Sequence, residues 1–167
     1  MMKLRSKILA GMSVVAVAGA VAATGLTVAS ASQGAGSSGT EYFQLVNATV
    51  ANNAPSSIIA RGVFTAGGVD HPGSKVDTVV FPDGTFKIAH SGGTGTPRFN
   101  PRTCLGTIVL NGTYRLSGGT GAYVGISGHG IYRLNILLVI ARNSGGKCSN
   151  RPTAFQQIIR AQGPVSL

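Results

Sequence analysis

Residues 116–132, from Leu116 to Tyr132, read LSGGTGAYVGISGHGIY, with six glycines and two tyrosines between two segments of strand character. Glycine is favoured where the backbone needs a positive φ or must pass close to a neighbouring chain. Such a density of glycines predicts a tightly turning segment with one defined conformation, and it argues against a flexible linker.

Short runs of β-branched and aromatic residues alternate with turn-forming dipeptides on both sides of this segment, and no window has a sustained helical period. Two turns stand out, Pro82-Asp83-Gly84 and Asn111-Gly112, the second being the pair preferred in type I′ hairpins. We predict antiparallel neighbours at both turns. The eight predicted strands are residues 42–50, 57–65, 76–81, 85–90, 104–110, 113–116, 130–142 and 154–161.

Eight short antiparallel strands need protected edges, and closure into a barrel protects them completely, although a two-sheet sandwich fits the same strand count. Within residues 130–142 the even positions are uniformly apolar, whereas Arg133 and Asn135 interrupt the odd ones. One face of this strand is therefore a core face. The other face is expected to line a pocket or to meet another subunit.

The glycine segment resembles the G-G-T-G-x-Y/F-x-G-x-x-G signature of the allene oxide cyclase and dirigent barrels, and of secreted actinobacterial proteins with an allene-oxide-cyclase-like domain. The resemblance implies an all-β, calycin-like, eight-stranded antiparallel barrel that holds a hydrophobic small molecule. Barrels of this family are often trimeric, so the resemblance also implies a homo-oligomer. No motif matches the acid-bearing pocket of dirigent proteins or the catalytic pocket of plant allene oxide cyclase, so neither activity is carried over. The matching residues, which are principally structural in the family, are Gly118, Gly119, Thr120, Gly121, Tyr123, Gly125, Gly128 and Gly130.

Residues 1–31 have the pattern of a secretory signal peptide, with three basic residues before an apolar run that ends in Ala29-Ser30-Ala31. A membrane anchor is the alternative, since the run is long enough to span a bilayer. Its small residues favour cleavage, and we predict a secreted, extracellular protein without a permanent anchor. Residues 32–40 are Ser/Gly-rich and predicted to be flexible, and residues 41–167 are predicted to form the barrel domain.

Cys104 and Cys148 are the two cysteines, and export would place them where thiols oxidise. We predict a disulfide between them, with a catalytic thiol as the alternative. Two cysteines without clustered histidines make a poor zinc site, and no metal or cofactor is expected.

The chain has 14 Lys and Arg against 4 Asp and Glu, a formal net charge of +10. Without residues 1–31 the net charge is about +7, because three basic residues leave with them. The basic residues are dispersed, with no aromatic stacking motif among them, which argues against a nucleic-acid partner. An anionic polymer of the cell envelope is a candidate partner.

The scarcity of acids narrows the search for proton-transfer groups. Asp83 lies in a turn and Glu41 borders the predicted flexible segment, so both are set aside. The catalytic candidates are Asp70, His71, Asp77 and His90. The alternative is structural: Asp70-His71 would serve a loop, His90 would be a hydrogen-bonded histidine at a strand end, and His129 would face solvent in a turn.

Arginines within apolar alternation give a further clue, at Arg61, Arg133 and Arg160. A buried guanidinium needs a partner, which a ligand carboxylate or phosphate would supply, unless these side chains face solvent. The ligand-binding candidates are Arg61, His90, Arg133 and Asn135. Three hypotheses follow. The first is a secreted protein that binds a hydrophobic or amphiphilic small molecule in its interior, with acidic molecules among the candidates. The second is an isomerase or cyclase that acts on such a molecule, and the third is an envelope-associated structural protein.

Overall fold

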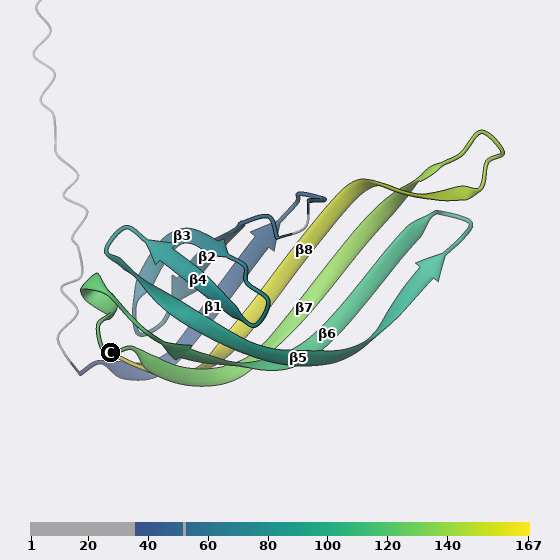
Figure 1. Cartoon of the computed structure of the whole chain (residues 1–167). Helices are drawn as coiled ribbons and strands as arrows, with labels where there is room; N and C mark the ends of the chain where they lie inside the picture. Colours follow the sequence, from purple (N-terminus) through teal and green to yellow (C-terminus); the bar gives the residue numbers. More distant parts are fainter. Residues whose placement is uncertain (1–35, 52) are drawn as a thin grey trace, which may run out of the picture. The chain divides into compact units, whose positions relative to one another are not determined.

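The computed structural model describes residues 36–51 and 53–167, so the predicted signal peptide and residues 32–35 of the predicted flexible segment lie outside the described residues. The described part of the chain is all-β, apart from the 3-10 turn η1 (Gly121–Tyr123) (Figure 1). It contains no helix long and apolar enough to cross a membrane. The strands are β1 (Ser38–Asn47), β2 (Ser56–Arg61), β3 (Thr65–His71), β4 (Val76–Phe81), β5 (Gly84–Asn100), β6 (Leu105–Ser117), β7 (Ser127–Arg142) and β8 (Cys148–Ser166).

The eight strands form one antiparallel sheet that closes in a ring, because each strand pairs with the next and β8 pairs with β1. Along the closing seam, Ser38 lies opposite Ser166 and Asn47 opposite Gln157. Strand β1 therefore begins at Ser38, inside the segment predicted to be flexible, because pairing with β8 gives these residues hydrogen-bond partners. Closure also protects the sheet edges along this seam, which a sandwich would leave open.

The predicted turn at Pro82-Asp83-Gly84 is present between β4 and β5, whereas the hairpin predicted at Asn111-Gly112 is wrong. Both Asn111 and Gly112 lie inside β6, which runs without a break. Gly112 pairs with Tyr132 on β7, and the tyrosine ring occupies the space that a Cβ at position 112 would need. Glycine is required at position 112 because the ring of Tyr132 packs against its backbone, and not because the chain turns.

The strand predicted at residues 57–65 is also wrong, because the chain reverses within it. Strand β2 ends at Arg61, Gly62 takes a φ of +147°, and β3 begins at Thr65. Strand β3 carries Gly67 and Gly68 in its centre, which weakens its strand pattern in the sequence. The predicted count of eight agrees with the structure because one strand was missed and another was counted twice.

Strands β5–β8 are longer than β1–β4, and their far ends continue as a four-stranded extension of the sheet (Figure 1). The predicted disulfide joins the tips of this extension: Cys104 follows β5 and Cys148 opens β8, with their Cα atoms 5.4 Å apart. Neither cysteine is free, so the catalytic-thiol alternative is excluded.

Six aromatic side chains fill the end of the interior where the β2–β3 and β4–β5 turns lie. Tyr123, on η1, is buried there with its ring centroid 5.1 Å from that of Phe64. The turn sits under the β4–β5 hairpin, because Ala122 donates a hydrogen bond to the Asp83 carbonyl at 2.8 Å. Gly121 takes a φ of +57° at this close approach. The glycine segment therefore closes this end of the sheet, whose aromatic cluster consists of Phe43, Phe64, Phe81, Phe86, Tyr114 and Tyr123.

Candidate ligand-binding cavity

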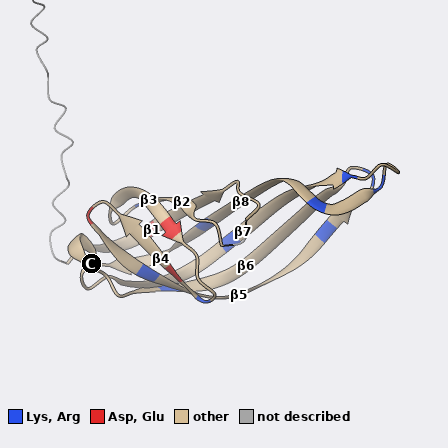
Figure 2. Ribbon diagram, turned by 45° about the horizontal axis from the view of Figure 1, so that its top comes forward, with Lys and Arg blue, Asp and Glu red and all other residues tan. Residues whose placement is uncertain are grey.

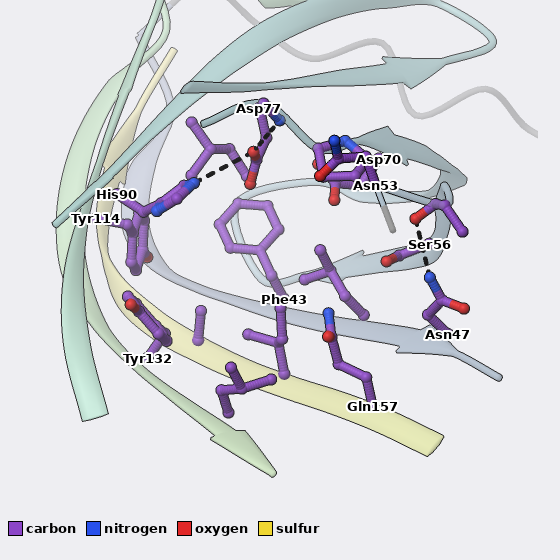
Figure 3. A pocket seen from close by; sticks show the side chains of 18 of the residues that line it. Phe43, Asn47, Asn53, Ser56, Asp70, Asp77, His90, Tyr114, Tyr132 and Gln157 are labelled. Carbon is purple, nitrogen blue, oxygen red and sulfur yellow. Dashed lines mark hydrogen bonds and ion pairs between the residues drawn. The ribbon is translucent and has the colours of Figure 1, made fainter. Parts of the chain in front are cut away.

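A cavity of about 350 Å³ occupies the other end of the interior, where β1 and β3 finish and β2 and β4 begin (Figure 3). Aromatic and aliphatic side chains form most of its wall. The apolar lining includes Phe43, Leu45, Ile88, Leu134, Phe155 and Ile159. The polar lining includes Asn47, Ser56, Asp70, Asp77, His90 and Gln157. An apolar wall with a few polar groups is typical of small-molecule sites.

Asp77 is held in place from two sides. Its Oδ1 accepts a hydrogen bond from the Gly73 N–H at 2.8 Å and lies 3.3 Å from Nε2 of His90. His90 in turn donates its backbone N–H to the Lys75 carbonyl at 3.0 Å. The loop between β3 and β4 and the strand β5 thus fix the orientation of an Asp–His pair at the cavity wall.

Asp70, near the end of β3, is the most deeply buried polar side chain of the cavity, with 2 % of its surface exposed. Its Oδ1 has no hydrogen-bond partner among the described residues. Burial, and to a smaller extent the neighbouring charge of Asp77, raises the pKa of Asp70 to about 7. The carboxyl group is therefore able to exchange a proton near neutral pH.

Glu41 is a third interior acid, and the interpretation that it borders a flexible tail is wrong. Because β1 begins at Ser38, Glu41 takes an inward position on the same strand face as Phe43 and Leu45, and it is fully buried. Its Oε2 accepts the Phe64 N–H at 3.1 Å, and burial raises its pKa. The alternation of Glu41 with Phe43 and Leu45 was the signal that could have placed it inside.

Acidic and basic residues are separated in this molecule (Figure 2). The acids lie in and around β1–β4, where Arg61 and Lys75 are the basic residues, whereas the other basic residues are distributed along β5–β8 and their connecting loops, to the far ends of these strands. Glu41, Asp70 and Asp77 point into the interior, and Asp83 alone is on an exposed turn. All eleven Lys and Arg in the described part of the chain are exposed. A chain with a large positive net charge therefore encloses an acidic interior.

The structure brings together three of the four catalytic candidates, Asp70, Asp77 and His90, at one cavity wall. It does not bring His71 there, because adjacent residues of a strand point to opposite faces and His71 follows the inward Asp70. His71 and His129 are both exposed. The pair Asp70-His71 is therefore not a catalytic unit.

Of the four ligand-binding candidates, His90 alone lines the interior cavity, and Arg61, Arg133 and Asn135 do not. On β7 the inward positions are Tyr132 and Leu134, so Arg133 and Asn135 face outward. Arg133 lies directly opposite Arg160 on β8, and both line a second concavity of about 650 Å³ together with Arg61. The interior cavity therefore has no arginine in its lining, and the three arginines lie together at the second concavity.

No group of three metal-ligating side chains occurs within residues 36–51 and 53–167. Comparisons of the chain with protein-family models, with curated proteins and with solved structures found no match. The likeness of the glycine segment to the allene oxide cyclase and dirigent signature remains a resemblance of sequence.

Proposed function

We propose that this protein is exported and binds a hydrophobic or amphiphilic small molecule inside a barrel of the allene oxide cyclase and dirigent type. The cavity beside Asp70 and His90 is the observation that carries the proposal, because it is walled mainly by apolar side chains and has the size of a small-ligand site. The closed antiparallel sheet and the glycine segment that closes one end of it support the barrel assignment.

Export is supported by two independent features. The disulfide between Cys104 and Cys148 is of a kind that persists in oxidising compartments. Residues 1–31 have the charge and small-residue pattern of a cleaved signal peptide. Mass spectrometry of the protein recovered from culture medium would measure the cleavage site and detect any retained ligand. Recovery from the cells alone, with residues 1–31 attached, would contradict the export proposal.

A pair of tryptophan substitutions on β7 tests the binding site. Leu134 lines the cavity, whereas Ile131, on the same strand, faces outward and is 61 % exposed. We expect Leu134→Trp to fill the cavity and to lower the affinity for the neutral fluorescent probe N-phenyl-1-naphthylamine by at least about tenfold, while Ile131→Trp leaves it unchanged. Equal affinities in both variants, or no binding by the unaltered protein, would refute an interior site.

A second candidate function is that of an isomerase or cyclase, and the environment of Asp70 favours it. A carboxyl group with a pKa of about 7 can donate a proton to a bound molecule, and the imidazole of His90, which lines the same cavity, can accept one from it, so a rearrangement leaves the proton count unchanged. The cavity wall would add catalysis by positioning.

Isotope exchange tests this second function. The retained ligand is incubated with the protein in deuterated water, recovered and weighed by mass spectrometry. Rearrangement by proton transfer places deuterium on carbon, and Asp70→Asn should slow the incorporation by at least about a hundredfold. A recovered ligand without deuterium and without a change of structure would leave binding as the function.

A further inference from the structure

We propose that the interior cavity selects an amphiphilic amine, whose ammonium group lies against Asp70 and Asp77 and whose apolar chain lies against Phe43, Leu134 and Phe155. This inference rests on the proposed binding function and names the chemical class of the ligand. It reverses the sequence-based expectation of an acidic ligand.

The charge of the cavity wall gives the first argument. Two carboxyl groups, on Asp70 and Asp77, line the cavity, and no Lys or Arg is among its lining residues. The eleven basic side chains of the described chain are all exposed, and none of them lines the cavity beside these acids. A ligand carboxylate would meet like charges here, whereas an ammonium group would meet opposite ones.

The unpaired oxygen of Asp70 gives the second argument. Asp70 lines the cavity and has only 2 % of its surface exposed. Its Oδ1 has no hydrogen-bond donor in the described structure. A buried carboxyl oxygen without a donor is unfavourable, and a charged N–H group from a ligand would supply the missing bond. A hydrocarbon without donors would leave this oxygen unsatisfied.

Asp77 adds a second contact for the same group. Its hydrogen bonds from Gly73 and His90 both end on Oδ1, so Oδ2 is left without a partner among the described residues. Figure 3 shows Asp70 and Asp77 along one side of the cavity, with Phe43 projecting toward them from β1. An ammonium group with three N–H donors can therefore bond to both carboxyl groups while its chain follows the apolar wall.

Three probes with the same eight-carbon chain test the inference at neutral pH: octylamine, 1-octanol and octanoate, each titrated against bound N-phenyl-1-naphthylamine. We expect octylamine to bind about ten to a hundred times more tightly than 1-octanol, in line with one or two hydrogen bonds between charged groups. Octanoate should bind most weakly.

Asp70→Asn should bring the affinity for octylamine closer to that for 1-octanol, with the remaining preference due to Asp77, and should leave the affinity for 1-octanol unchanged. Asp83→Asn is the matched control, because it removes the same charge from an exposed turn, and it should preserve the amine preference. If Asp70→Asn does not fold, Asp77→Asn takes its place, with the amine preference again expected to fall.

The outcomes separate this inference from the proposed function. Equal binding of the three probes, or an amine preference that persists undiminished in Asp70→Asn and Asp77→Asn, overturns the assignment of an amine while the interior site stands. No binding of any probe, including N-phenyl-1-naphthylamine, overturns the binding function itself.

Discussion

The carboxyl group of Asp70 lies in the wall of a mainly apolar cavity, and this position determines its pKa. The group loses water on folding and gains no donor for Oδ1, so the neutral form is favoured. Glu41 differs in that backbone N–H groups offset part of its burial, although its pKa is still raised. Both residues therefore hold a proton more tightly in the folded protein than in the unfolded chain.

The raised pKa of Asp70 makes stability depend on pH. Because its folded pKa of about 7 exceeds the ordinary value of 3.8, the folded state binds this proton more tightly than the unfolded state does. The contribution of Asp70 to the free energy of unfolding is complete below pH 3.8 and is lost as the pH rises through about 7. The loss amounts to at most about 4 kcal/mol.

Urea unfolding at mildly acidic and at weakly alkaline pH measures this effect. Asp70→Asn should flatten the dependence and should unfold at a higher urea concentration than the unaltered protein above neutral pH. An unchanged pH dependence in the variant would show that Asp70 does not carry it.

At the scale of an element, the glycine segment between β6 and β7 acts as a cap. Its chain winds so tightly that η1 sits beneath the β4–β5 turn and directs Tyr123 into the aromatic cluster. Glycines along β6 and β7 serve the neighbouring aromatic rings: Gly112 lies under Tyr132 and Gly130 under Tyr114. The glycines at η1 are therefore explained by a tight turn of the backbone, and Gly112 and Gly130 by close packing against aromatic rings.

Gly119→Ala tests this cap. A Cβ at position 119 would collide with the carbonyl oxygen of Tyr123, a backbone atom that cannot move without the turn. We expect a loss of about 2–4 kcal/mol in the free energy of unfolding, measured by chemical denaturation. Gly92→Ala is the control, since open space surrounds that position, and it should change stability by less than about 1 kcal/mol. Similar losses in the two variants would refute the steric explanation.

At the scale of the whole described chain, closure of the sheet separates the charges. The acids of β1, β3 and β4 point inward, whereas every arginine and lysine of the described residues is exposed. Arg133 on β7 and Arg160 on β8 are direct neighbours on adjacent strands, where their like charges repel each other. The outer surface is therefore suited to anionic polymers, as the alternative of an envelope-associated protein requires.

Adsorption to a polyphosphate resin measures this surface property. Binding should weaken steeply between about 0.05 and 0.5 M NaCl, because salt screens contacts between exposed charges. Affinity for N-phenyl-1-naphthylamine should stay constant over the same range, since the interior site depends mainly on apolar contacts. Adsorption that is insensitive to salt would argue against an electrostatic contact.

Residue type and alternation at two-residue spacing are local properties, and they were enough to predict the all-β class and the core face of β7. The two cysteines predicted the disulfide, and the scarcity of acids singled out Asp70, Asp77 and His90. That these three residues meet at one cavity, and that Arg133 lies outside it, depends on the folded sheet. Strand register across the ring decides which side chains meet, and register depends on pairing between residues far apart in the chain: Gly112 with Tyr132, and Ser38 with Ser166. The first pairing makes β6 continuous where the sequence predicted a hairpin. The second pairing includes the start of β1 in the sheet, where the sequence predicted a flexible segment, and so places Glu41 in the core.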